Sequence, residues 1–188
     1  MEHFYANLEG ENWFTYPNLY KELVGKCSDD QSSHFVEVGS WKGKSACFMA
    51  VEIINSNKEI KFDCIDCWIK DDVYNEFVNN ITPVRSVINV IRNYSNIAFR
   101  SYDDCSLDFV FIDAHHTYES VKEDINCWYP KLKIGGILAG HDYWPESHTE
   151  YNLNVNRAVI DSFDSNFYAT SEGCWVHTKK ESTVKSII

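Results

Sequence analysis

Acidic residues close four short apolar runs of this 188-residue chain, and histidines accompany two of them. The acids are Glu37, Asp66, Asp113 and Asp142, and the histidines are His115, His116 and His141. A carboxylate attracts an amine or a metal cation, and an imidazole that titrates near neutral pH can accept a proton from a hydroxyl. Four acids at the ends of apolar runs are hard to explain as random surface charge, so we expect them to share one site.

The first acid belongs to a run from Phe35 to Ser45 that predicts a buried strand, a glycine turn and a helix start. The turn reads Glu37-Val-Gly39-Ser-Trp-Lys-Gly43-Lys-Ser45. Glycines let the backbone turn sharply and approach a ligand, and a helix start attracts an anion. Because Glu37 would repel a phosphate and attract an amine, the run favours a ligand with an amino group. A simple packing turn without a ligand is the alternative.

Two nucleotide-binding motifs fail on the spacing of this turn. Gly39 and Gly43 are separated by three residues, so the dinucleotide fingerprint G-x-G-x-x-G is absent. A P-loop requires four residues between its glycines, although Gly43-Lys44-Ser45 matches the end of that motif. A P-loop phosphotransferase therefore remains as an alternative function, with Lys44 at the phosphates.

The rest of the chain predicts the elements that must position these residues. Strands are expected at Glu59–Asp66, Ser86–Arg92, Leu107–Asp113 and Ile137–Ala139, the last after a Gly135-Gly136 turn, with a closing pair near Phe167–Ala169 and Cys174–His177. Helices are expected at Pro17–Cys27, Ala46–Ile54, Ser95–Tyr102, 118–128 and Leu153–Phe163. In the fourth helix, Ser120 and Glu123 form a capping-box pattern that would place its start slightly later, and Pro130 would end it. Residues 69–84 are polar and ambiguous.

Strands that alternate with helices predict an α/β fold with three layers around a mostly parallel sheet. Ligands bind at the carboxyl ends of the strands in such sheets, where the four acids would gather. Asp66, one strand after the glycine turn, stands where ribose hydroxyls bind in Rossmann-like units, and a capping or loop aspartate is the alternative. We expect one domain: an N-terminal extension and helix (1–28), a ligand-binding core (33–143) and a C-terminal helix and strand pair (144–188).

Composition narrows the partners and the location. The formal net charge of −11 argues against nucleic acid and anionic membranes, because both bind basic surfaces. No apolar run approaches the length of a membrane span. The chain starts Met1-Glu2-His3 without a basic-then-apolar leader, and its seven cysteines are irregularly spaced. We therefore expect a cytoplasmic protein with reduced thiols.

Two further motifs carry a resemblance to a known family. They are the run Leu107 to Tyr118, which contains Asp113-Ala-His115-His116-Thr-Tyr118, and the run Gly135-Gly-Ile-Leu-Ala-Gly-His141-Asp142-Tyr143. With the glycine turn and Asp66-Cys-Trp68, they resemble the class I S-adenosylmethionine-dependent methyltransferases, in the branch of sugar and macrolide O-methyltransferases and cephalosporin-hydroxylase-like proteins (methyltransferase family 24). The resemblance spans about residues 33–143. It implies a Rossmann-like sandwich whose seven-stranded sheet ends in an antiparallel strand.

The resemblance also implies roles for individual residues. Glu37 would face the amino group of the cofactor, Ser45 its carboxylate and Asp66 its ribose. The full set expected at S-adenosylmethionine is Glu37, Gly39, Ser40, Trp41, Gly43, Ser45, Asp66, Ser95 and Asp113. A divalent metal, Mg²⁺ or Mn²⁺, would lie at Asp113, His141 and Asp142, where the histidine replaces an acid that is frequent in the family. His116 would be the general base, with Asp113 as the second catalytic residue. The neighbouring His115 is the alternative base.

The expected function is methyl transfer to a hydroxyl of a small molecule, a sugar or a glycan. The short N-terminal and C-terminal segments leave room for a small lid only, so we expect the acceptor to be held partly at a homodimer interface or to be the end of a chain. Besides the phosphotransferase, two alternatives remain. One is a methyltransferase-like domain that binds the cofactor or a partner without catalysis. The other is a metal-dependent hydroxylase or hydrolase that uses His115, His116, His141 and Asp142.

Overall fold

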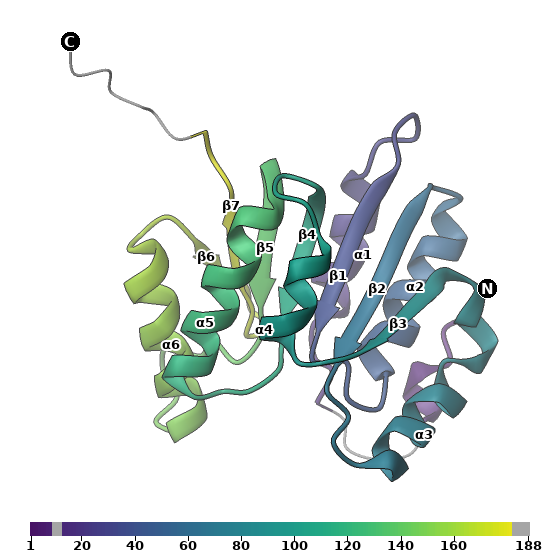
Figure 1. The fold of residues 1–188 in the computed structure, drawn as a ribbon, viewed down its shortest axis with the longest axis horizontal. Helices are drawn as coiled ribbons and strands as arrows, with labels where there is room; N and C mark the ends of the chain where they lie inside the picture. Colours follow the sequence, from purple (N-terminus) through teal and green to yellow (C-terminus); the bar gives the residue numbers. More distant parts are fainter. Residues whose placement is uncertain (9–12, 182–188) are drawn as a thin grey trace.

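The computed structural model describes residues 1–8 and 13–181, which form a seven-stranded sheet with helices on both faces (Figure 1). The strand order is β3-β2-β1-β4-β5-β7-β6. The bounds are β1 Ser33–Val38, β2 Ile60–Asp66, β3 Ile88–Arg92, β4 Leu107–Ile112, β5 Leu132–Gly140, β6 Tyr168–Ala169 and β7 Trp175–Thr178. Strands β1 to β5 are parallel, and β7 is antiparallel to both of its neighbours. The expected α/β fold with one antiparallel C-terminal strand is confirmed.

The helices divide between the two faces of the sheet (Figure 1). One face is covered by α1 (Pro17–Lys26), α2 (Lys44–Ser56) and α3 (Asp71–Asn80), the other by α4 (Ser95–Ala98), α5 (Tyr118–Trp128) and α6 (Glu150–Phe163). Side chains alternate along a strand, so Phe35 packs toward α1 and α2 while Val36 and Val38 pack toward α5. Glu37 shares the face of Phe35 and therefore lies beneath α1.

Both glycines of the β1–α2 turn are required by close packing. Gly39 has φ +92°, and a Cβ there would lie 2.1 Å from the carbonyl oxygen of Asp113. Gly43 has φ +83° and precedes α2, and a Cβ there would lie 2.9 Å from the ring of Phe77 on α3. The turn is thus pressed against the end of β4 and against α3, as only glycine permits.

Three local predictions are wrong. Gly135 and Gly136 lie within β5, because Leu132 and Ile137 both pair with β4 and the glycines form the irregularity between them. Helix α5 begins at Tyr118, since the cap is Thr117, whose hydroxyl accepts a bond from the backbone N–H of Ser120 at 3.2 Å. Ser86 and Val87 belong to a 3-10 helix, Thr82–Val87, that precedes β3.

The remaining element predictions hold, with shifts of a few residues at the ends. The ambiguous stretch 69–84 contains α3 and the start of the 3-10 helix. Pro130 follows α5 in another 3-10 helix, Tyr129–Lys131. The expected units 1–28 and 144–188 extend over residues 9–12 and 182–188, which lie outside the described residues.

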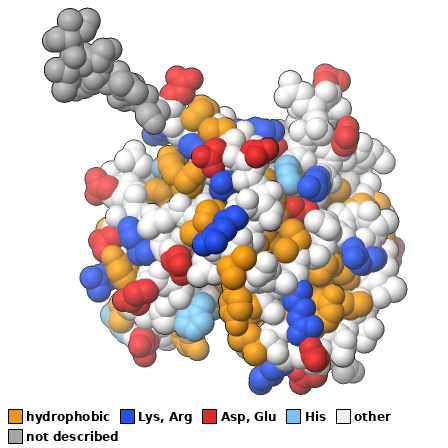
Figure 2. Space-filling view, viewed as in Figure 1, with side chains coloured by type: hydrophobic (Ala, Val, Ile, Leu, Met, Phe, Trp, Pro, Cys, Tyr) orange, Lys and Arg blue, Asp and Glu red, His pale blue; other side chains and the backbone are white. Residues whose placement is uncertain are grey.

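The described helices include none long and apolar enough to cross a membrane. On the face drawn in Figure 2, basic and acidic side chains are interspersed, and no broad basic area is present there. The expectation that nucleic acid is not the partner stays a prediction from the net charge.

Candidate active site

A cavity of about 1100 Å³ opens at the carboxyl ends of β1, β2, β4 and β5. Of the four acids expected there, Asp66, Asp113 and Asp142 line it. Glu37 is one residue short of the end of β1 and lies just beneath the floor, where it is only 1% exposed. The topology therefore brings the predicted residues together, as the carboxyl ends of parallel strands meet at one edge of a sheet.

Glu37 is the centre of a buried cradle below the glycine turn. The hydroxyl of Tyr20 donates to Oε2 at 2.7 Å, and the hydroxyls of Ser40 and Ser45 lie beside the carboxylate. Neither Oε1 of Glu37 nor Oγ of Ser40 has a hydrogen-bond partner. Burial raises the pKa of Glu37 to about 7, and the hydrogen bond from Tyr20 and the nearby hydroxyls of Ser40 and Ser45 oppose that rise.

The two unpartnered atoms indicate what the cradle would bind. Buried polar atoms are normally hydrogen-bonded, so a free carboxylate oxygen next to a free hydroxyl points to a ligand that satisfies both. An ammonium group would donate to Glu37, and a carboxylate would accept from Ser40 and Ser45 and lie near the N-terminus of α2. The residues present therefore fit the amino-acid end of S-adenosylmethionine.

Asp66, the last residue of β2, organises the loop beside this cradle. Its Oδ2 accepts the backbone N–H of Trp41 and its Oδ1 that of Trp68, both at 2.9 Å. The indole N–H of Trp68 in turn donates to the carbonyl of Trp41 at 2.7 Å. Each carboxylate oxygen keeps a second lone pair for a hydroxyl donor. The loop role and the expected ribose role are therefore compatible, and Trp41 contributes through its backbone as well as its ring.

A second buried acid, which we did not identify from the sequence, lies further along the cavity wall. Asp124 of α5 is 6% exposed, and burial raises its pKa to about 6. It lies beside Ser95, whose hydroxyl also accepts the indole N–H of Trp128 at 2.8 Å. The signal was present, because residue 124 falls within the apolar helical stripe that contains Val121 and Trp128.

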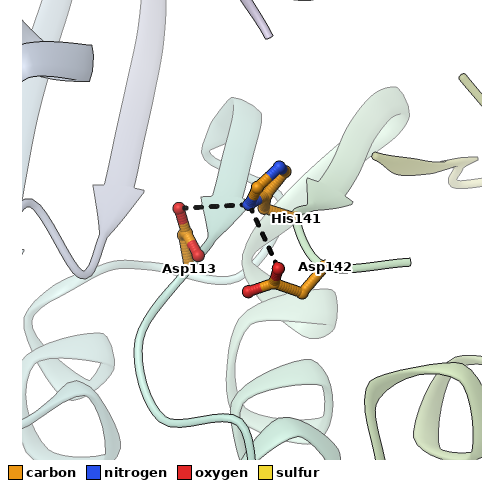
Figure 3. A group of neighbouring side chains, drawn as sticks. All are labelled: Asp113, His141 and Asp142. Carbon is orange, nitrogen blue, oxygen red and sulfur yellow. Dashed lines mark ion pairs between the residues drawn. The ribbon is translucent and has the colours of Figure 1, made fainter. Parts of the chain in front are cut away.

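Asp113, His141 and Asp142 form the acid–histidine cluster drawn in Figure 3. One ligand atom from each lies within 4.8 Å of the others, and Nδ1 of His141 is 3.9 Å from Asp113 and 3.6 Å from Asp142. Two carboxylates and an imidazole suit divalent cations such as Mn²⁺ better than Mg²⁺, which prefers oxygen ligands. The donor set therefore fits a metal ion at the place that the sequence predicted.

His116 lies between the two carboxylates of this cluster. Its Nε2 is 2.9 Å from Asp142 and 3.4 Å from Asp113. Burial lowers the pKa of His116, but the bonds and charges of the two carboxylates outweigh burial and raise the pKa to about 9. The same contacts outweigh burial at Asp142 and lower its pKa. His116 is thus an imidazolium at neutral pH. His115 also lines the cavity, but it is exposed, and its Nδ1 accepts the backbone N–H of Thr117 at 3.4 Å.

The N-terminal segment adds residues that the sequence left unassigned. The hydroxyl of Tyr16 donates to Oδ2 of Asp113 at 3.0 Å, and Oγ1 of Thr15 lies 2.9 Å from Nε2 of His141. Both residues line the cavity, together with the exposed rings of Trp13, Trp144 and Tyr151. Aromatic side chains from segments on both sides of the core therefore line the cavity.

The family model described as "Methyltransferase domain" matches residues 36–143, more than half of the chain. Among solved structures, a candidate caffeoyl-CoA O-methyltransferase from Staphylococcus aureus has a TM-score of 0.68 at 16% identity, covering 93% of this chain and 87% of that one. The cofactor-bound Rv0187 from MTB has a TM-score of 0.67 at 13% identity, with coverage of 94% and 87%. A candidate rRNA methylase from Clostridium thermocellum has a TM-score of 0.62 at 11% identity, with coverage of 90% and 97%. The TM-scores establish a shared fold, and identities this low show nothing beyond it. No curated protein matches the sequence.

Proposed function

This chain belongs to the methyltransferase-domain family and is an S-adenosylmethionine-dependent methyltransferase, and we propose that it methylates a hydroxyl oxygen of a small molecule, a sugar or a glycan. One observation carries the proposal. A single cavity joins a cradle shaped for an amino-acid end to a histidine held between two carboxylates. The first part suits the cofactor, and the second suits removal of a proton from the acceptor.

At the cofactor end, each role follows from a contact already present. Glu37 would accept the ammonium group at Oε1, and Ser40 and Ser45 would donate to the carboxylate. Asp66 would accept the ribose hydroxyls while its loop bonds hold it in place. Ser95 lies with Asp124 where the adenine would follow. S-adenosylmethionine, when bound, supplies an electrophilic methyl group on a sulfonium.

At the acceptor end, the chain must orient a hydroxyl and take its proton. Methyl transfer requires oxygen, carbon and sulfur in line, so positioning is a large part of catalysis. His116 would accept the proton in its neutral form, which its pKa of about 9 makes a minority at neutral pH. A divalent cation held by Asp113, His141 and Asp142 would lower the pKa of the acceptor hydroxyl and offset the carboxylate charge.

The fold does not select the acceptor, since proteins named for caffeoyl-CoA and for rRNA share it. Two features of this chain support a small uncharged ring. The net charge of −11 disfavours RNA, and the rings of Trp13, Trp144 and Tyr151 in the cavity lining offer flat apolar faces. The homodimer and the cytoplasmic location stay predictions.

Calorimetric titration with S-adenosylhomocysteine and with ATP, each with and without Mn²⁺, tests the cofactor assignment. We expect micromolar binding of S-adenosylhomocysteine and none of ATP. Asp66→Asn should weaken binding, whereas the control Asp71→Asn should not, because Asp71 is an exposed partner of Arg92. Binding of ATP alone would favour the phosphotransferase. Cofactor binding without methyl transfer to any of a panel of hydroxyl acceptors would favour the non-catalytic domain.

A further inference from the structure

Two tyrosines reach the floor of the cavity from outside the matched region 36–143. Tyr16 immediately precedes α1 and Tyr20 lies one turn later, so both point to the same side of the helix. Their rings are 5.1 Å apart, and both side chains are at most 2% exposed. Tyr16 donates to Asp113 and Tyr20 to Glu37. Asp113 and Glu37 are therefore each hydrogen-bonded by a buried tyrosine hydroxyl.

We propose that Tyr20 is a positioning residue for cofactor binding: its hydroxyl holds Oε2 of Glu37 and leaves Oε1 for the amino group of the cofactor. The inference rests on the proposed function, because Glu37 is the residue assigned to that amino group. The bond is 2.7 Å long, and Tyr20 is fully buried, so water does not replace it. Among the described residues, Tyr20 is the one hydrogen-bond donor to the Glu37 carboxylate. The other carboxylate oxygen, Oε1, has no partner.

The hydroxyl also affects the charge of Glu37. The other titratable groups that face the carboxylate are Tyr16 before α1, Cys47 of α2, Cys64 of β2 and Asp113 after β4. Burial raises the pKa of both tyrosines and both cysteines, so these groups are neutral at physiological pH. Asp113 raises the pKa of Glu37, and the bond from Tyr20 opposes it. Loss of that bond should therefore favour protonated Glu37, which cannot pair with an ammonium group.

The substitution Tyr20→Phe removes the hydroxyl and keeps the ring. We expect its affinity for S-adenosylhomocysteine to be roughly 3- to 30-fold weaker at pH 7, from the loss of one charge-assisted bond. The inflection of affinity against pH should move to higher pH, so the deficit should shrink toward pH 9. Tyr102→Phe is the matched control, because Tyr102 donates to Asp63 at 2.7 Å in a similarly buried pair that does not line the cavity. Its pH profile of binding should equal that of the wild type.

A second measurement needs no ligand. The carboxyl ¹³C shift of Glu37, followed against pH, should titrate at higher pH in Tyr20→Phe than in the wild type. Wild-type binding together with an unchanged profile and an unchanged titration in Tyr20→Phe would overturn the positioning role and leave the proposed function intact. Failure of the wild type to bind S-adenosylhomocysteine at every pH would overturn both.

Discussion

Two acidic centres lie at the same edge of the sheet and differ in how their charge is balanced. Glu37 is fully buried among hydroxyls and thiols, and burial raises its pKa to about 7. Asp142 pairs with His116 at 2.9 Å, and its pKa is lowered. The pKa of His116 rises to about 9 in the same contact. Glu37 therefore lacks a cation, whereas Asp142 is already paired with the imidazolium of His116.

The difference shows what each end of the cavity requires from a ligand. A buried carboxylate without a cation is costly, and a ligand that brings an ammonium group removes that cost. A carboxylate already paired with an imidazolium gains little from a second cation until the first one moves or loses its proton. On the proposed function, Glu37 would therefore bind the cofactor without a prior change, whereas His116 would have to lose its proton before it could act as a base.

The largest effect on the reaction should come from a substitution in the centre of Asp142 and His116, where the carboxylate is already paired with a cation. His116→Asn removes the base, and we expect kcat for methyl transfer to fall by roughly 10²- to 10⁴-fold, the usual contribution of general acid–base catalysis. The rate would be measured by transfer of labelled methyl groups to an acceptor found in the panel. Affinity for S-adenosylhomocysteine should change by less than about twofold, since His116 contacts no cofactor residue other than Asp113. A rate within twofold of the wild type would show that another group takes the proton.

A substitution of Glu37, the carboxylate without a cation, should change the affinity for the cofactor rather than the rate of methyl transfer. Glu37→Gln keeps an oxygen that accepts the bond from Tyr20 but removes the negative charge. We expect the Kd for S-adenosylhomocysteine to rise by roughly 30- to 1000-fold, because truncating one partner of a buried charge pair costs about 2–4 kcal/mol. Calorimetry at pH 8, where wild-type Glu37 is ionised, measures this directly. Equal Kd values would place the ammonium group elsewhere.

Acidity should weaken the cofactor end without mutation. Since the pKa of Glu37 is about 7 in the free protein, a proton competes with the ammonium group below that pH. The Kd for S-adenosylhomocysteine should rise up to about tenfold per pH unit between pH 7 and 5.5. Asp66→Asn should show the same slope at weaker absolute affinity. A flat profile in the wild type would mean that Glu37 is already ionised in the free protein.

Most of the fold, and the residues at the carboxyl ends of the strands, could be predicted from the sequence. Alternating apolar runs predicted the order of strands and helices, and the four acids at their ends predicted the edge where the cavity opens. The errors are local. Gly135-Gly136 has the composition of a turn but is an irregularity within β5, because both flanking segments pair with β4. Sequence composition does not show with which neighbouring strand a segment pairs.

The outer contacts could not be predicted for a related reason. Tyr16 and Asp113 are 97 residues apart in sequence, and Thr15 and His141 are 126 apart. No local pattern links such residues, since their meeting depends on how α1 packs over the sheet. Asp124 differs, because a charge on an apolar helical stripe is visible in sequence. The residues around Glu37 and Asp66 thus lie in short motifs, whereas the contacts of Thr15 and Tyr16 join distant segments.

The smallest predicted effect concerns the stability of the ligand-free protein. The folded-state pKa of Glu37 lies above its ordinary value of 4.5, so its contribution to stability is full at low pH and is lost as pH rises from about 4.5 to about 7. Glu37→Gln avoids the buried charge. We therefore expect it to be more stable than the wild type by about 1–3 kcal/mol at pH 8, with little difference near pH 4. Urea unfolding at the two pH values gives both free energies.

His116→Asn is the control, and its difference from the wild type should be a loss of stability that shrinks, rather than a gain that grows, as pH rises. The folded-state pKa of His116 lies above its ordinary value of 6.5, so its contribution is full below about pH 6.5 and is lost as pH rises through about 9. This variant should be less stable than the wild type at pH 6 and should approach it above pH 9. If Glu37→Gln were instead destabilised at pH 8, the Glu37 carboxylate would already have a cation in the free protein. The contrast between the two centres would then be wrong.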